Sequence, residues 1–242
     1  MNERQKTVIV TGASQGIGAG VANAFFNRGF NVVANSRKMS QSTEVAASDR
    51  VALVDGDIGD PATAGRIVET ALSRFGSIDA LVNNAGIFMS KPFVDYSPDD
   101  LKSLVSTNVE GFLYVTQLSI KQILAQGTGG SIVTITAALA RNPIRGFPAA
   151  VPMITKGGLE TITQHLAMEY AQNSIRVNAV APGVVDTPLH RETPRDVMES
   201  LSPMGRPSTV KEISDAVLYL TDAVTVTGQI LYVDGGAHFG RW

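Results

Sequence analysis

The chain has 242 residues, a hydrophobic fraction of 44%, a charged fraction of 17% and a formal net charge of −2. This composition is typical of one globular domain with a sizeable core, and it gives no electrostatic basis for binding nucleic acid or an anionic membrane. Because the chain has no cysteine and its 3 histidines lack metal-ligand spacing, no disulfide and no metal site are expected. Neither a secretory leader nor a membrane span is indicated, so we expect a cytoplasmic protein.

Short apolar runs rich in valine and isoleucine recur along the chain with little alternation, which is typical of parallel strands buried on both faces. The predicted strands cover residues 7–12, 31–35, 50–55, 78–84, 131–136, 175–183 and 229–236. Stretches with helical spacing lie between them, at residues 16–29, 61–76, 97–124, 156–171 and 209–222. This alternation predicts a single α/β domain over residues 1–242, with a doubly wound parallel sheet and helices on both faces.

Residues 187–209 interrupt this alternation. The segment contains four prolines and no clear strand, and it follows the predicted strand 175–183. Doubly wound folds bind ligands at the carboxyl ends of their strands, and long loops in compact domains tend to be functional. We therefore expect a lid on the substrate side of the domain; an ordinary surface excursion is the alternative.

A glycine-rich stretch, VTGASQGIGAG, follows the first predicted strand and opens the first predicted helix. Small residues let the backbone turn tightly and approach a pyrophosphate, while the helix N-terminus offers free N–H groups. In this strand–loop–helix context the pattern predicts a dinucleotide-binding loop. Its expected cofactor contacts are Gly12, Ser14, Gln15, Gly16, Ile17 and Gly18.

The end of the second predicted strand discriminates between dinucleotides. A carboxylate there would bind both hydroxyls of the adenosine ribose, but this chain has Ser36 followed by Arg37. Because the guanidinium fork matches phosphate oxygens, we expect NADP(H) to be preferred over NAD(H). The alternative is a solvated surface arginine. Asp57 and Ile58, after the third predicted strand, are expected on the adenine side of the same site.

Taken together, these motifs resemble the short-chain dehydrogenase/reductase family over nearly the whole chain. The motifs are TGASQGIG (11–18), NNAG (83–86), TNVEGF (107–112), SIVTIT (131–136), TKGGL (155–159), IRVNAVAPGVVDTP (175–188) and VTGQILYVDGG (226–236). The resemblance implies a Rossmann fold with a seven-stranded sheet, a homotetramer, and hydride transfer between nicotinamide and an alcohol or carbonyl carbon of a small-molecule substrate. The further cofactor residues that it implies are Asn84, Ala85, Gly86, Lys156, Pro182, Gly183, Val185 and Thr187.

Four residues usually act together in this family: an asparagine, a serine, a tyrosine and a lysine. Asn108 and Lys156 match the asparagine and the lysine. The serine position falls on Ala137, or on Thr136 if the register shifts by one, and the tyrosine position falls on Pro152. The residues predicted to act in catalysis are therefore Asn108, Thr136 and Lys156.

Pro152 leaves three functions open. Proline is tolerated in the first turn of a helix, so we expect Lys156 to keep its ribose contact while proton transfer is impaired. The favoured interpretation is an NADP(H)-dependent oxidoreductase with an atypical site, in which Thr136, Arg141 or Arg145 could polarise the substrate. The alternatives are a catalytically silent NADP(H)-binding pseudoenzyme or scaffold, and an isomerase or dehydratase on the same fold.

Overall fold

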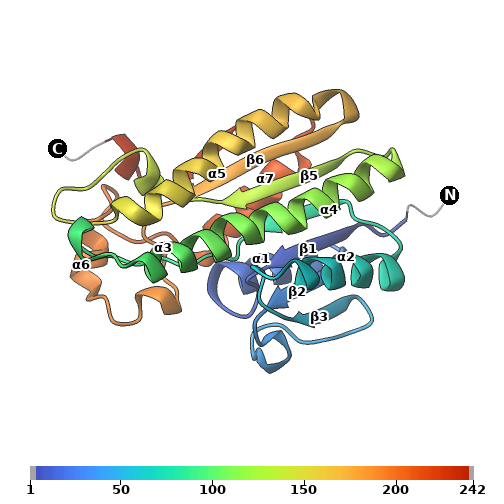
Figure 1. Ribbon diagram of the computed structural model, residues 1–242, viewed down its shortest axis with the longest axis horizontal. Helices are drawn as coiled ribbons and strands as arrows, with labels where there is room; N and C mark the ends of the chain where they lie inside the picture. Colours follow the sequence, from blue (N-terminus) through green and yellow to red (C-terminus); the bar gives the residue numbers. More distant parts are fainter. Residues whose placement is uncertain (1–3, 240–242) are drawn as a thin grey trace.

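The computed structural model describes residues 4–239, which form one parallel sheet between two layers of helices (Figure 1). The strand order is β3-β2-β1-β4-β5-β6-β7, and neighbouring strands are parallel throughout. The predicted doubly wound, seven-stranded fold is confirmed. The strands are β1 (Thr7–Thr11), β2 (Asn31–Ser36), β3 (Val51–Asp55), β4 (Ala80–Asn83), β5 (Gly130–Ile135), β6 (Ile175–Pro182) and β7 (Ile230–Val233).

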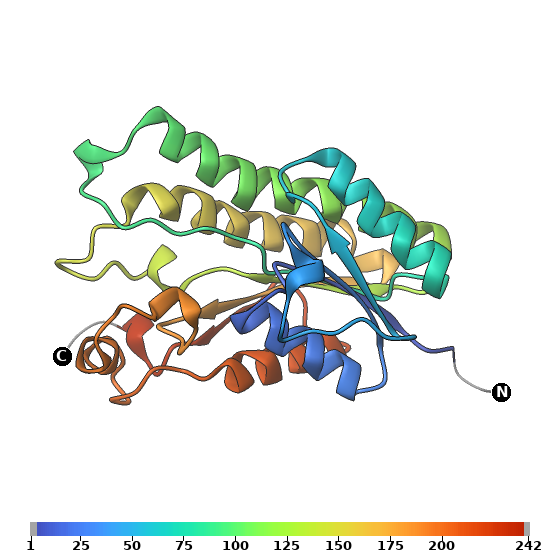
Figure 2. The same ribbon diagram turned by 90° about the horizontal axis from the view of Figure 1, so that it is seen from below.

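Helices cover both faces of the sheet, as Figure 2 shows. One layer holds α1 (Gly16–Asn27) and α7 (Val210–Asp222), and the other holds α2 (Pro61–Phe75), α4 (Gly111–Gln126) and α5 (Ala150–Glu169). The shorter helical segments are α3 (Pro98–Val105), α6 (Arg195–Ser200), η1 (Met39–Gln41), η2 (Phe93–Asp95), η3 (Ser106–Glu110), η4 (Ala138–Ala140), η5 (Ala171–Asn173), η6 (Pro188–His190) and η7 (Ala237–Phe239).

Side chains fix where several helices begin. Capping boxes start α3, through Ser97 and Asp100, and α7, through Thr209 and Glu212. In each box the two residues satisfy otherwise free backbone N–H groups reciprocally. Gln15, the residue before α1, makes no such side-chain hydrogen bond. The first N–H groups of α1 therefore remain available to a ligand.

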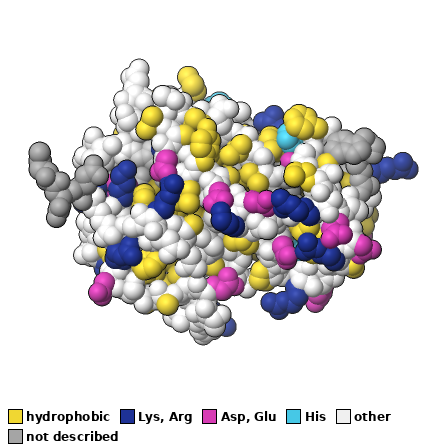
Figure 3. All heavy atoms as spheres, turned by 180° about the vertical axis from the view of Figure 1, so that it is seen from behind, with side chains coloured by type: hydrophobic (Ala, Val, Ile, Leu, Met, Phe, Trp, Pro, Cys, Tyr) yellow, Lys and Arg dark blue, Asp and Glu magenta, His cyan; other side chains and the backbone are white. Residues whose placement is uncertain are grey.

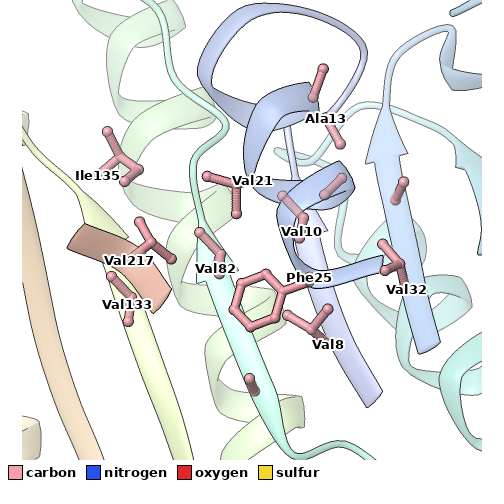
Figure 4. Close-up of a cluster of buried hydrophobic side chains, with 14 of the residues drawn as sticks. Val8, Val10, Ala13, Val21, Phe25, Val32, Val82, Val133, Ile135 and Val217 are labelled. Atoms are coloured by element: carbon pink, nitrogen blue, oxygen red, sulfur yellow. The ribbon is translucent and has the colours of Figure 1, made fainter. Parts of the chain in front are cut away.

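The core between the sheet and α1 is made of small, closely packed apolar side chains (Figure 4). Phe25 of α1 lies fully buried among Val8, Val10 and Val82, which come from the strands beneath it. Val217 of α7 belongs to the same cluster. Because these strands are covered on both faces, their sequences are almost continuously apolar, and this is why the sequence pattern located them.

The predicted helix 97–124 is continuous but not uniform. Between α3 and α4 the chain forms one π-helical turn, η3, and Asn108 lies within it. Single π turns inside longer helices are frequent at functional sites. Apolar spacing averaged over the whole stretch could not reveal this turn, because its extra residue shifts the register of only one turn.

The helix predicted over 156–171 begins earlier, at Ala150, and ends at Glu169. Pro152 occupies its first turn, where a backbone N–H has no helical partner to lose. The proline therefore did not delay the start of the helix. Lys156 lies one turn further along α5 instead of at its beginning.

The face formed by α1 and α7 carries acidic and basic side chains interspersed with apolar ones (Figure 3). It presents no large field of one sign, in keeping with the small net charge. Among the helices of residues 4–239, none is long and apolar enough to cross a membrane.

We predict that Phe25→Ala lowers the free energy of unfolding by about 3–5 kcal/mol, because the truncation leaves a cavity in a closely packed core. Urea denaturation followed by circular dichroism measures the loss. The matched control is Phe93→Ala, since Phe93 is 69% exposed, and it should change stability by less than about 0.5 kcal/mol. Equal losses in the two variants would contradict this account of the core.

Candidate active site

The predicted site residues lie at or after the carboxyl ends of six strands, β1 to β6, or on helical segments that meet them there. In Figure 1 this end of the sheet also carries α6 and the segment that follows β5. Parallel strands place their carboxyl ends along one edge, so loops far apart in sequence meet. These residues are Gly12, Ser14 and Gln15 after β1, Gly16, Ile17 and Gly18 at the start of α1, Ser36 and Arg37 at the end of β2, Asp57 and Ile58 after β3, Asn84, Ala85 and Gly86 after β4, Thr136 after β5, and Pro182, Gly183, Val185 and Thr187 at the end of β6.

The glycine loop leaves no room for side chains. A Cβ atom on Gly18 would lie 2.2 Å from the carbonyl oxygen of Gly12 and 2.5 Å from Nδ2 of Asn84. Asn84 holds this arrangement, because its Nδ2 donates to the carbonyl oxygens of Thr11 and Gly12, each at 3.0 Å. Gly16 has a φ of +58°, and a Cβ atom on it would lie 3.5 Å from the side chain of Thr187. The loops after β1, β4 and β6 thus enclose one cradle.

Unpaired polar atoms lie at the end of β2. Oγ of Ser36 and Oδ1 of Asn35 are buried without a hydrogen-bond partner in the described chain. Arg37 is exposed, and its guanidinium contacts no acidic side chain of residues 4–239. The turn that follows is fixed by Ser40, whose backbone N–H and hydroxyl donate to Asp55 and lower the pKa of that carboxyl. Buried polar atoms without a partner could be satisfied by a bound ligand.

The two residues expected on the adenine side have different environments. Asp57 is exposed and accepts a hydrogen bond from the backbone N–H of Gly59 at 2.9 Å, which closes a short turn. Ile58 is buried against Gly111, and a Cβ atom on Gly111 would lie 2.6 Å from Cγ2 of Ile58. The segment after β3 is thereby fixed to the start of α4.

Asn108 is fully enclosed by hydrogen bonds. Its Oδ1 accepts from the backbone N–H of Ile87 at 2.8 Å, and its Nδ2 donates to the carbonyl oxygen of Ile87 at 3.1 Å and to Oγ1 of Thr155 at 2.9 Å. Thr155 in turn donates to the carbonyl oxygen of Pro152 at 2.7 Å. Its hydroxyl joins the π turn to the first turn of α5.

Lys156 points toward the same region as Asn108. Its Nζ donates to the carbonyl oxygen of Ile135 at 2.9 Å. A Cβ atom on Gly86 would lie 3.1 Å from this Nζ and 3.3 Å from Oδ1 of Asn108, so both side chains border one small space over Gly86. Desolvation of the ammonium lowers the pKa of Lys156 to about 8.

Thr136 is buried and turned toward α5. Its Oγ1 lies 3.3 Å from Oε1 of Glu160 and 3.3 Å from the carbonyl oxygen of Val180. Glu160 is fully buried and also accepts from Nε of Arg141 at 3.0 Å. Sequence reasoning missed Glu160, although one signal was available: a lone carboxylate one turn after Lys156 on an otherwise apolar helix face.

Two contacts fix the segment between β5 and α5. The rings of Phe88 and Phe147 stack with centroids 6.1 Å apart, and Oγ of Ser90 donates to the carbonyl oxygen of Pro148 at 2.9 Å. Residues 137–149 therefore lie against the segment after β4. Ala137 and Pro152, which the resemblance places at or beside the family's serine and at its tyrosine, have side chains without a hydroxyl.

The segment 187–209, predicted without a strand, contains η6 and α6. It closes on itself through a parallel bridge between Val185 and Ser208, and Arg195 binds Asp186 and Glu199. These exposed ion pairs contribute little stability each. The segment lies at the end of the sheet that bears the site (Figure 1).

We predict that Gly18→Ala weakens dinucleotide binding at least tenfold, because the added methyl group must displace the Gly12 carbonyl or Asn84. Isothermal titration calorimetry with NADPH and NADH measures the loss. Gly65→Ala is the matched control, since a Cβ atom on that helical glycine meets no atom within 4 Å. Unchanged affinity in Gly18→Ala would show that ligands do not use this cradle.

Comparison with known proteins agrees with this geometry. A family model described as enoyl-(acyl carrier protein) reductase matches residues 12–238. Glucose 1-dehydrogenase of Gluconobacter oxydans is 34% identical, with 96% of this chain and 91% of the relative covered. L-rhamnose 1-dehydrogenase (NAD(P)(+)) of a Sphingomonas species is 33% identical, with 96% of each chain covered.

Solved structures share the whole fold. The 3-ketoacyl-(acyl-carrier-protein) reductase of Brucella melitensis, complexed with NADH, superposes with a TM-score of 0.89 at 33% identity and covers 96% of this chain and 98% of its own. The chain therefore belongs to the short-chain dehydrogenase/reductase family, a family of oxidoreductases.

Proposed function

We propose that the protein is an NADP(H)-dependent oxidoreductase that acts on the carbonyl or alcohol group of a small molecule, through a site without the tyrosine of its family. When bound, the nicotinamide supplies or accepts a hydride. The chain binds and orients the two reactants and exchanges a proton with the substrate oxygen. In this proposal Asn108 and Lys156 act in catalysis, and Thr136 supports the strand end between them.

One observation carries the proposal: Asn108 and Lys156 converge on Gly86, at the edge of a complete dinucleotide cradle. Burial of the ammonium lowers the pKa of Lys156. Burying a charged group is unfavourable, and a side chain with a purely structural role would not need to be charged. Gly86 itself is exposed, which leaves the space above it open to a ligand.

The preference for NADP(H) rests on Arg37. Its unpaired guanidinium follows Ser36, whose buried hydroxyl has no partner of its own among the described residues. Both groups suit the oxygens of a 2′-phosphate, and neither repels one. The relatives include enzymes described with NADH and with NAD(P)(+), so the family alone does not decide the cofactor.

The substrate class rests on the relatives. Their names include dehydrogenases of glucose and of L-rhamnose, and a 3-ketoacyl reductase. We therefore infer a polyol, an aldose or a ketoacyl compound, admitted beneath residues 187–209 as a lid. The stacked pair Phe88 and Phe147 supplies an apolar wall for the carbon chain of such a substrate.

A homotetramer is part of the proposal, and exposed apolar side chains support it. A shallow groove between α4 and α5 is lined by Phe112, Leu113, Ile120, Leu124 and Leu166. Leu113 and Leu124 are 36% and 40% exposed. Contiguous apolar surface of this kind marks a protein–protein contact.

The absence of a serine and a tyrosine from their expected positions favours two alternative functions. Pro152 and Ala137 offer no acid and no hydroxyl, which suits a silent NADP(H)-binding pseudoenzyme. The same absence suits an isomerase or dehydratase, in which the cofactor would not change its redox state overall. Both alternatives keep the cradle intact and differ only in turnover.

We predict that Arg37→Ala raises the Kd of NADPH about 10- to 150-fold, since a charge-assisted hydrogen bond contributes about 1.5–3 kcal/mol. The Kd of NADH should change less than about twofold. Fluorescence titration of both cofactors measures the two constants, with Lys121→Ala on α4 as the control. A parallel loss for NADPH and NADH would instead assign Arg37 a structural role.

The proposed function predicts cofactor turnover. NADPH oxidation should proceed with at least one member of a panel of aldoses, ketoses, polyol-derived ketones and ketoacyl thioesters. NADPH binding without turnover on the whole panel would favour the pseudoenzyme. Substrate conversion at constant cofactor absorbance would favour the isomerase or dehydratase.

A further inference from the structure

No tyrosine takes the place of the missing one. The chain has 5 tyrosines, and all of them lie within the described residues. Tyr96 donates its hydroxyl proton to the carbonyl oxygen of Met89 at 2.7 Å. The other four lie on α4, at the end of α5, on α7 and on β7, which places none of them beside Gly86; they are Tyr114, Tyr170, Tyr219 and Tyr232.

Two other side chains that could polarise the substrate, Thr136 and Arg141, form hydrogen bonds within the protein. The Thr136 hydroxyl and the Arg141 guanidinium both meet the carboxylate of Glu160. This carboxylate is fully buried, so removing either contact would leave a buried charge less compensated. Arg145 is exposed and has no partner in residues 4–239, but a guanidinium is a very weak acid near neutral pH.

Lys156 retains free donors at the reacting position. An ammonium carries three N–H groups, and only the one directed at Ile135 has a protein acceptor in the described chain. Its Nζ borders the space over Gly86, on the helix face that bears Pro152 one turn earlier. Proline carries no proton there, so the amine is the nearest titratable group to that space.

No charged side chain stabilises the ammonium. Charged residues of the surrounding elements include Glu160 and Glu169 on α5, Arg141 and Arg145 after β5, Glu110 beside Asn108 and Asp186 after β6. Glu160 and Arg141 bind each other, and Asp186 binds Arg195. Burial alone therefore brings the pKa of Lys156 to about 8, close to working pH, where a general acid or base is most effective.

We propose that Nζ of Lys156 itself exchanges the proton with the substrate oxygen, in place of a tyrosine; this inference rests on the oxidoreductase function proposed above. When a carbonyl is reduced, an N–H bond of the ammonium breaks and the O–H bond of the alcohol forms. The carbonyl carbon receives its hydride from NADPH, which is oxidised. The neutral amine then regains its proton from water, and the oxidation of an alcohol follows the reverse course.

The experiment compares the wild type with Lys156→Arg, and Lys211→Arg on α7 serves as the control. Arginine keeps the positive charge and the donors but does not release a proton near neutral pH. The measurements are the Kd of NADPH, kcat for the best carbonyl substrate across pH 6–10, and the 13Cε resonance of Lys156 in protein labelled with 13C-lysine. Thermal unfolding checks that both variants fold.

We expect the 13Cε resonance that disappears in Lys156→Arg to titrate near pH 8. The wild-type kcat for reduction should fall as pH rises through this midpoint, because the ammonium loses the proton that it must donate. In Lys156→Arg, kcat should fall on the order of 10²- to 10⁴-fold, and the Kd of NADPH should change less than about tenfold. The decrease in kcat as pH rises through about 8 should be absent from this variant.

Three results would overturn the inference alone while the wild type turns over: a midpoint near the ordinary value of 10.5, an unchanged kcat in Lys156→Arg, or a loss explained entirely by weaker NADPH binding. The last would leave Lys156 as a ribose contact only. No wild-type turnover on any carbonyl, with NADPH bound, would instead overturn the proposed function, and the inference with it.

Discussion

The hydrogen bonds of the buried Asn108 side chain connect three segments of the candidate site. They bind both backbone groups of Ile87, after β4, and the hydroxyl of Thr155, on α5. A π turn brings the amide to this depth, because it offsets Asn108 from the regular helical rows of α3 and α4. Buried polar groups are costly unless they are fully paired, so this network fixes the relative positions of three segments.

The same principle operates at the glycine loop, with steric exclusion in place of hydrogen bonding. Gly12 and Gly18 approach each other and Asn84 more closely than any side chain allows. The backbone N–H groups of α1 are consequently presented to the space in front of them. A loop that packs this tightly loses little conformational freedom when a ligand binds.

Glu160 pairs with the polar and charged groups nearest to it and leaves Lys156 without a charged partner. Its carboxylate binds both the Thr136 hydroxyl and the Arg141 guanidinium. The amine of Lys156 then lies among uncharged neighbours, and burial alone sets its pKa. Lys156 lies one helical turn after Pro152 on the same face of α5.

The sequence alone predicted the seven strands, their parallel arrangement and the loops of the cofactor cradle, because strands buried on both faces are continuously apolar and glycines mark close backbone approaches. It also placed Asn108 and Lys156 by resemblance to one family. It did not predict the π turn, the early start of α5 or the pairing of Glu160 with Arg141. These features depend on contacts between residues distant in the chain, and hydrophobic periodicity reports only local spacing. Only the tertiary structure decided which polar groups at the site pair with one another, and that the Lys156 amine has the Ile135 carbonyl as its one acceptor among the described residues.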